Sequence, residues 1–170
     1  MRYGIVADTH NRVLPSLFEA LAGVEEILHA GDVCRRQVLA EIEAAAPVVA
    51  VHGNCDEWPL VHELPAERRI EREGVAIALV HGHQAGSASP ERMAKLYGAG
   101  PRAAAKPDAA GPPPDLVIFG HSHQACDVVR GGIRFFNPGT AGGVRYSPTV
   151  GILTIEDGRL QLKHVELARR

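Results

Sequence analysis

The chain has 170 residues, of which 45% are hydrophobic and 5% aromatic, and its formal net charge at pH 7 is −2. This length favours one domain, residues 1–170, with a sizeable core; the charge indicates no clear nucleic-acid surface, and no apolar stretch reaches the roughly 20 residues of a membrane span. The N-terminus has no basic region before a long apolar one, and the three cysteines are widely spaced, so we expect a reduced, cytoplasmic protein outside the membrane.

The first half of the chain alternates short apolar runs with helical patterns. Apolar residues recur at helical spacing from Leu14 to Leu21 and from Val38 to Ile42. Strands separated by helices of this length form βαβ units, whose strands are parallel and end on one side of the sheet. Residues 67–80 have a glycine between two strand-like runs and therefore predict a hairpin.

The second half begins with a Gly/Pro/Ala-rich insertion at residues 84–114, which contains a short helical pattern around 93–97. We interpret the insertion as a loose surface segment or as a lid, because long connections of this kind are commonly one or the other. Two further hairpins are predicted over residues 127–136 and 150–165. Together the patterns predict an α/β fold, a two-sheet αββα sandwich of mixed parallel and antiparallel strands with flanking helices.

Five of the apolar runs end in residue types that bind metals. The runs cover residues 3–7, 26–30, 48–52, 75–80 and 116–119. At or just after their ends lie Asp8, His10, Asp32, Asn54, His81, His121 and His123. Ligands bind beyond the carboxyl ends of parallel strands, and carboxylate, amide and imidazole donors suit divalent transition metals. We therefore predict that these side chains share one metal site.

The local spacing of the candidate ligands supports this prediction. Asp8 and His10 are two residues apart, as are His121 and His123, and side chains at i and i+2 of extended backbone point the same way. A glycine precedes several ligands and permits sharp backbone geometry. Asp56 is open to two interpretations, a cap of the following turn or a support of the ligands.

These blocks resemble the five motifs of the calcineurin-like metallophosphoesterases, and more closely those of the small bacterial and archaeal phosphodiesterases of that superfamily. The matching segments are Asp8-x-His10, Gly31-Asp32, Gly53-Asn54-Cys55-Asp56, His81-Gly82-His83 and Gly120-His121-x-His123. Asn137-Pro138-Gly139-Thr140 also resembles that group's Asn-Pro-Gly-Ser turn, with Thr in place of Ser. The resemblance runs from residue 4 to about residue 142, interrupted by the insertion.

The resemblance implies two divalent metal ions that share Asp32. One ion is expected on Asp8, His10, Asp32 and His123, and the other on Asp32, Asn54, His81 and His121. A hydroxide between the ions is expected to attack a small phosphate ester, such as a cyclic nucleotide or another phosphodiester. Manganese is our first choice, with Fe, Zn, Ni, Co and Mg as alternatives, because imidazole–carboxylate sites select weakly among metals.

Asn54, Cys55 and His83 are the candidate catalytic residues. Many larger relatives have a histidine, thought to protonate the leaving group, at the position of Cys55. A thiol with an ordinary pKa of about 8.5 is a poor partner for a leaving alkoxide. We therefore expect slow turnover of alkyl phosphomonoesters and better turnover of activated phosphodiesters. His83 is open to three interpretations: facing the metals, orienting phosphate, or packing.

The alternative function is a non-catalytic interaction scaffold, because the retromer coat contains a similar small fold with a degraded metal site. The complete ligand set of this chain argues against that alternative. His29 lies inside a predicted strand and is interpreted as a core or rim residue, so its mutation is expected to leave bound metal unchanged. The oligomeric state is open, with a homodimer as one option.

Overall fold

The computed structural model describes residues 1–98 and 112–169. In chain order the elements are β1 (Arg2–Val6), α1 (Pro15–Ala20), β2 (Glu26–His29), α2 (Arg36–Ile42), β3 (Val48–Ala50), α3 (Trp58–Glu63), β4 (Glu67–Arg72), β5 (Val75–Val80), the 3-10 turn η1 (His83–Ala85), α4 (Pro90–Leu96), β6 (Leu116–Ile118), β7 (Cys126–Arg130), β8 (Ile133–Asn137), β9 (Thr149–Glu156) and β10 (Arg159–Glu166). All three predicted hairpins are present, as β4–β5, β7–β8 and β9–β10.

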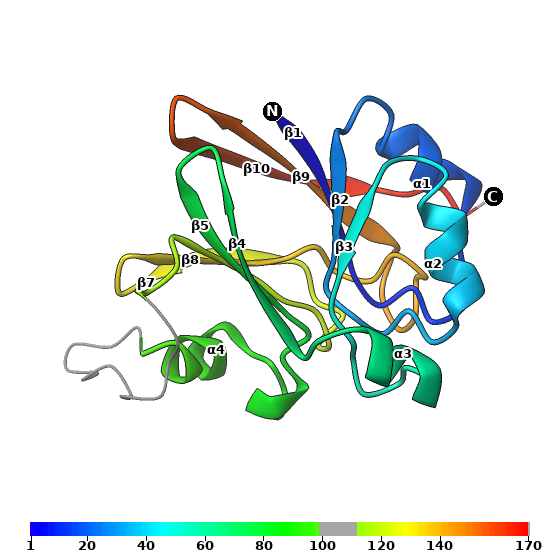
Figure 1. The fold of residues 1–170 in the computed structure, drawn as a ribbon, viewed down its shortest axis with the longest axis horizontal. Helices are drawn as coiled ribbons and strands as arrows, with labels where there is room; N and C mark the ends of the chain where they lie inside the picture. Colours follow the sequence, from blue (N-terminus) through cyan, green and yellow to red (C-terminus); the bar gives the residue numbers. More distant parts are fainter. Residues whose placement is uncertain (99–111, 170) are drawn as a thin grey trace.

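The strands form two five-stranded sheets, in the orders β10-β9-β1-β2-β3 and β4-β5-β6-β8-β7. Strands β1, β2 and β3 are parallel, as are β5, β6 and β8, and the remaining strands add antiparallel edges. Helices α1 and α2 flank the first sheet and α4 lies beside the second (Figure 1). The predicted αββα sandwich with mixed sheets is confirmed.

Alternation along the strands explains the layers. In β1, Tyr3 and Ile5 point to the core between the sheets, whereas Val6 points outward to the cluster that contains Leu17 of α1 and Leu39 of α2. Successive side chains of a strand face opposite sides, so both faces of this strand are buried. Burial of one such side chain contributes about 1.5–3 kcal/mol, so these strands are held firmly.

Part of the predicted loose insertion is ordered packing instead. The helix expected around residues 93–97 is confirmed and begins earlier, at Pro90, where the Ser89 side chain accepts a hydrogen bond from the Arg92 amide at 3.4 Å. Met93 is fully buried in the same cluster as Phe135 of β8. The interpretation as a loose segment is therefore wrong for α4. For residues 99–111 the two interpretations, a loose surface segment and a lid, stay open, because these residues lie outside the described ones.

An ion pair also joins the two sheets. Arg72 of β4 donates two hydrogen bonds to the carboxylate of Glu26 in β2, at 2.9 and 3.0 Å.

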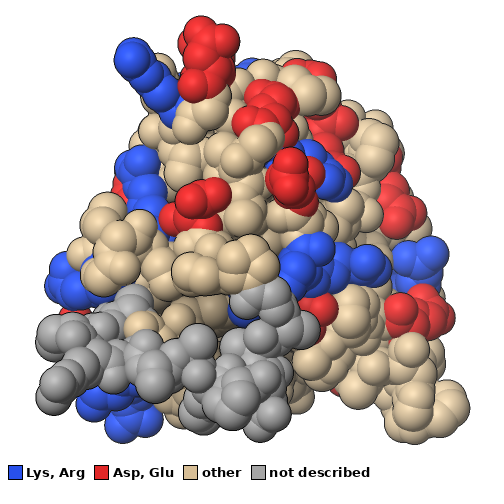
Figure 2. Space-filling view, turned by 60° about the vertical axis from the view of Figure 1, so that its left-hand side comes forward, with Lys and Arg blue, Asp and Glu red and all other residues tan. Residues whose placement is uncertain are grey.

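On the face shown in Figure 2, basic and acidic side chains are mixed. Within the described ranges, no helix combines the length and the apolar character that a membrane crossing requires.

Candidate metal centre

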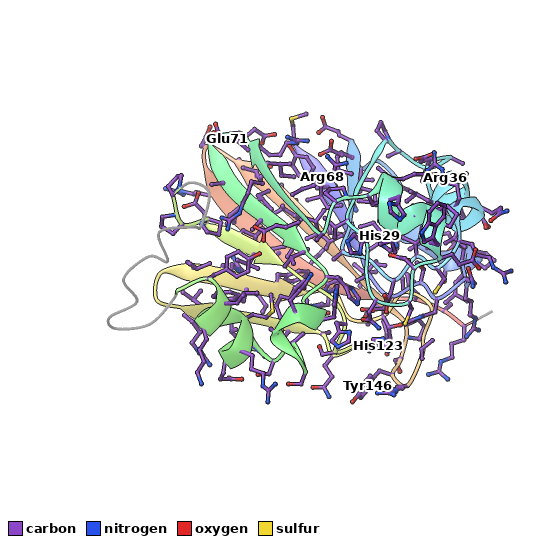
Figure 3. The ribbon with its side chains drawn as sticks, turned by 60° about the horizontal axis from the view of Figure 1, so that its bottom comes forward. His29, Arg36, Arg68, Glu71, His123 and Tyr146 are labelled. Carbon is purple, nitrogen blue, oxygen red and sulfur yellow. The ribbon has the colours of Figure 1, made fainter. Side chains whose placement is uncertain are left out.

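The loops that follow β1, β2, β3, β5 and β6 meet at one end of the sandwich, the lower end in Figure 1. Backbone hydrogen bonds connect them: the Asp8 amide donates to the Gly31 carbonyl at 3.0 Å, and the Gly120 amide donates to the His81 carbonyl at 3.0 Å. Figure 3 views the molecule from this end, where His123 lies. The parallel strands of both sheets thus deliver their polar loops to one place.

The first donor group consists of Asp8, His10, Asp32 and His123, each of which offers a ligand atom within 4.8 Å of the others. His123 Nε2 lies 3.4 Å from Asp8 Oδ1, and His10 Nε2 lies 3.7 Å from Asp32 Oδ2. The two Nε2 atoms of His10 and His123 are 3.1 Å apart. These are four of the predicted ligands, and they come from three loops.

The second donor group consists of Asp32, His81 and His121, again with ligand atoms within 4.8 Å of one another. His81 Nε2 lies 3.3 Å from Asp32 Oδ1 and 3.2 Å from the amide oxygen of Asn54. Asp32 belongs to both groups and presents one carboxylate oxygen to each side. All seven predicted ligands are therefore brought together.

The backbone that aims these side chains differs from the extended geometry expected from the sequence. Asp8 has φ +53°, His10 +46°, Asp32 +55°, His121 +67° and His123 +59°. Non-glycine residues rarely adopt this left-handed region, and such strain clusters at functional sites. The expectation that i, i+2 spacing on extended backbone turns these side chains together was wrong; tight left-handed turns do so.

The donor groups fit a divalent cation. Nδ1 of His81 donates to the Ala30 carbonyl at 2.8 Å, and Nδ1 of His123 donates to the Val144 carbonyl at 3.1 Å. Because a carbonyl oxygen only accepts hydrogen bonds, the Nε2 atoms of the neutral rings carry lone pairs that point into the site, as in histidines that ligate metals. Asp8 Oδ1 is buried and, among the described residues, has no hydrogen-bond partner. A buried carboxylate oxygen in this position calls for a cation.

Protonation equilibria of the site without metal follow from the same contacts. Burial opposes ionisation of Asp32, but hydrogen bonds and charge from His81 outweigh it and hold the pKa of Asp32 far below its ordinary value. Burial also lowers the pKa of His81, yet the Asp32 carboxylate raises it overall, and the Asp8 carboxylate raises the pKa of His123. In the metal-free site, protons on His81 and His123 therefore partly compensate the carboxylate charge that a bound cation would compensate.

Asp56 supports the site and does not cap the following helix. Its two carboxylate oxygens accept hydrogen bonds from the Cys34 and Gly53 amides, both at 2.6 Å. Helix α3 has Glu57 at its N-cap and no side-chain cap bond. Of the two interpretations of Asp56, the one as a support of the ligand loops is therefore confirmed.

His29 is fully buried in β2, as expected for a core residue, yet it joins two ligand loops. Its Nδ1 accepts a hydrogen bond from the Gly31 amide at 3.2 Å, so the proton sits on Nε2, which lies 3.4 Å from the Thr9 hydroxyl. Burial lowers the pKa of His29 to about 4, so the ring is neutral at pH 7. Sequence reasoning missed this role, and the position of a polar residue inside an apolar strand was the available signal.

Asn137 and Thr140 of the Asn-Pro-Gly-Thr turn are also fully buried. The Asn137 amide group donates to the Gly120 carbonyl at 2.9 Å and to the Ser122 hydroxyl at 3.1 Å, which holds the loop of His121 and His123. The resemblance pointed to this turn without giving it a role. Its contacts indicate that it positions the histidine loop.

Cys55 and His83 border the second donor group. The Cys55 amide donates to Asp32 Oδ1 at 2.8 Å, and burial together with the Asp32 charge raises the pKa of the Cys55 thiol to about 12. The His83 ring centre lies 5.4 Å from that of His81 and 6.3 Å from that of His121. Burial and these neighbouring histidines lower the pKa of His83.

Two groups of carboxylate and imidazole donors that share one carboxylate could hold divalent metal ions. The chain belongs to the calcineurin-like phosphoesterase superfamily, whose domain profile matches residues 1–158. This superfamily comprises metal-dependent phosphoesterases, as the resemblance of the motifs predicted.

Individual relatives agree with this assignment. The chain is 31% identical over 169 residues to a probable metallophosphoesterase of Methanothermobacter thermautotrophicus, with 94% of this chain and 89% of that protein covered. It is 27% identical to phosphodiesterase MJ0936 of Methanocaldococcus jannaschii, with 92% and 94% covered. A solved structure of a Vps29 variant from Entamoeba histolytica has the same fold, with a TM-score of 0.74, 22% identity, and 99% and 100% of the two chains covered.

Proposed function

We propose that the protein is a phosphodiesterase with two divalent metal ions, manganese by first choice, in the cytoplasm. The observation that carries the proposal is the sharing of Asp32 between two donor groups whose ligand atoms each lie within 4.8 Å of one another. The similarity to a named phosphodiesterase supports the choice of a diester substrate.

Each ligand has a place in this proposal. Asp8, His10, Asp32 and His123 hold one ion, and Asp32, Asn54, His81 and His121 hold the other. When bound, two such ions supply a water of lowered pKa and positive charge for the phosphate oxygens. The chain itself contributes only two carboxylates, Asp8 and Asp32, so the loaded site is cationic and attracts a small anionic phosphate ester.

The residues beside the second ion favour a diester with a good leaving group. The Cys55 thiol, with an ordinary pKa of about 8.5, is a poor partner for a leaving alkoxide, and in the metal-free site burial and Asp32 raise that pKa further. His83 has a lowered pKa and is neutral at pH 7, so we assign it the orientation of the phosphate through a hydrogen bond rather than proton donation.

The alternative is a non-catalytic interaction scaffold of the same fold. The likeness to Vps29 and the exposed Trp58 and Val61 on α3 favour it. The buried donor set counts against it, because a scaffold has no need for left-handed ligand turns or for two buried carboxylates facing histidines.

The test measures metal content and turnover together. The purified protein is expected to bind about two Mn²⁺ per chain, a typical content for two-metal hydrolases, and to hydrolyse bis(4-nitrophenyl) phosphate faster than 4-nitrophenyl phosphate. Asp32→Asn is expected to lose both metal and activity, whereas Asp157→Asn, in the exposed β9–β10 turn, retains them. Tight metal binding without hydrolysis of either ester would support the scaffold.

A further inference from the structure

His10 differs from two other ligand histidines in the partner of its Nδ1 atom. In His81 and His123 this atom donates to a backbone carbonyl, which can only accept a hydrogen bond. Nδ1 of His10 instead lies 3.7 Å from the sulfur of Cys34, a half-buried residue in the loop after β2. A histidine that binds a metal almost always has a hydrogen-bond partner on its other ring nitrogen. For His10, the described residues supply that partner as a thiol.

The backbone around Cys34 fixes the position of this sulfur. Cys34 has φ +73°, a left-handed conformation that a non-glycine residue keeps only when its surroundings hold it there. Its amide donates to Asp56 Oδ1 at 2.6 Å, and its carbonyl accepts from the Glu57 amide at 3.0 Å. Two contacts from the loop after β3 therefore hold the thiol beside His10.

The contacts of the metal-free site place a proton on Nε2 of His10 when the rings are neutral. This atom lies 3.1 Å from Nε2 of His123. Because Nδ1 of His123 donates to the Val144 carbonyl, Nε2 of the neutral His123 ring carries a lone pair. The two rings form a hydrogen bond only if His10 donates from Nε2, which leaves its Nδ1 as an acceptor. The S–H group of Cys34 can donate to that acceptor.

Metal binding requires the opposite tautomer of His10. An ion on the first donor group needs the lone pair of His10 Nε2, so the proton of the neutral ring lies on Nδ1. The sulfur of Cys34 can accept a hydrogen bond from this N–H. A thiol therefore serves both tautomers, whereas the carbonyl partners of His81 and His123 serve only one.

We propose that Cys34 is a positioning residue for His10, which donates a hydrogen bond to Nδ1 in the metal-free protein and accepts one from Nδ1 when the first donor group holds an ion. The inference rests on the proposed two-metal function, in which His10 Nε2 is a ligand. Because the thiol has both capacities, the ring of His10 changes its tautomer without losing the contact that orients it.

Two variants and a control test this contact by isothermal titration with Mn²⁺. Cys34→Ala leaves Nδ1 of His10 without its partner, so we expect the affinity for one of the two ions to fall roughly tenfold, with a smaller effect on the other. Cys34→Ser supplies a hydroxyl that both donates and accepts, so its affinities are expected to stay within about threefold of the wild type. Thr154→Ala is the control, because Thr154 pairs with Arg2 at the end of β1 opposite to the ligands.

The tautomer of His10 is measured by nitrogen-15 NMR of the histidine rings at pH 9. In the wild type we expect the proton on Nε2 in the metal-free protein and on Nδ1 after addition of two equivalents of Zn²⁺, which is diamagnetic. His62, an exposed histidine on α3, is the internal reference, and its tautomer is expected to stay the same.

The outcomes separate this inference from the proposed function. If the wild type binds no Mn²⁺, the two-metal function fails and the inference fails with it. If two ions bind and Cys34→Ala keeps both affinities, or if Cys34→Ser loses as much as Cys34→Ala, the function stands and the role of Cys34 is refuted. A proton on Nδ1 of His10 in the metal-free protein would refute it as well.

Discussion

The Asp32 carboxylate is held by contacts from three directions. The Cys55 amide donates to Oδ1 at 2.8 Å, His81 Nε2 lies 3.3 Å from the same oxygen, and His10 Nε2 lies 3.7 Å from Oδ2. The backbone of Gly53 passes so close that an added Cβ would overlap Oδ1. Position 53 therefore requires glycine because there is no room for a Cβ atom. Its backbone conformation does not require glycine, since its φ is not in the left-handed region.

This close approach makes Gly53→Ala a test of the site. The methyl group would overlap both the carboxylate and the backbone nitrogen of Asp32, which both donor groups share, so we expect displacement of this residue and a fall in Mn²⁺ affinity of roughly 10–100-fold, as for other residues that orient ligands. Isothermal titration of the metal-free protein with Mn²⁺ measures the change.

Gly74→Ala is the matched control. Gly74 lies in the β4–β5 turn with φ +76° and open space around it, so alanine there costs about 1–2 kcal/mol of backbone strain without reaching the site. We expect a lower melting temperature with unchanged Mn²⁺ affinity. Equal affinity losses in the two variants would show that general destabilisation, and not displacement of Asp32, weakens binding.

The candidate ligands were predictable because each is a metal-binding residue type at the end of an apolar run. Their local backbone was not predictable, since left-handed φ values at Asp8 or His121 depend on neighbours distant in sequence. The same holds for Asp56, whose partner Cys34 is 22 residues away. The spacing of the motifs along the chain predicts which residues lie close together. Contacts between residues distant in sequence determine how their side chains are oriented.

At the scale of elements, the connection between β8 and β9 joins the ligand loops of the two sheets. The Thr140 hydroxyl donates to the Asp8 carbonyl at 2.9 Å and accepts from the Val144 amide at 3.3 Å. The Val144 carbonyl in turn accepts from His123 Nδ1. One connection thus sets the positions of two ligands that are 115 residues apart in the chain.

Thr140→Val removes this hydroxyl at nearly constant volume. The buried Asp8 carbonyl and Val144 amide each lose a partner, so we expect a loss of about 1–3 kcal/mol in the free energy of unfolding and weaker Mn²⁺ binding. Urea unfolding and Mn²⁺ titration measure the two effects. Thr154→Val, at a half-buried position of β9, is the control. Thr140→Val with reduced stability and wild-type Mn²⁺ affinity would show that the connection does not position the ligands.

Hydrophobic periodicity predicted α1, α2, the three hairpins and the helix at α4, but not α3 or the turn η1. The packing of α4 was not predictable, because its surrounding sequence is rich in small residues and breakers. Met93 and Ala94 are buried against the second sheet in the same cluster as Phe135, and Tyr97 packs against that cluster. So short an apolar pattern between small residues and breakers predicts a helix but not the surface that the helix covers.

At the scale of the whole molecule, two sheets bring carboxylates and histidines face to face, so stability depends on pH. The raised pKa values of His81 and His123 stabilise the metal-free protein below the ordinary histidine value of about 6.5, and this contribution is lost as the pH rises through the raised values. The lowered pKa of His29, about 4, acts in the other direction: stability is lost as the pH falls from about 6.5 toward 4.

Metal binding reverses the first of these dependences. A cation requires neutral imidazoles, so its binding displaces the protons of His81 and His123 and becomes tighter as the pH rises. We therefore expect the difference in melting temperature between Mn²⁺-loaded and metal-free protein to widen between pH 6 and pH 8 at a fixed Mn²⁺ concentration. Scanning calorimetry at a series of pH values measures it, and His62→Asn, a substitution of an exposed histidine on α3, is expected to preserve the trend. A difference that stays constant or narrows over this range would mean that these two histidines do not exchange protons for metal.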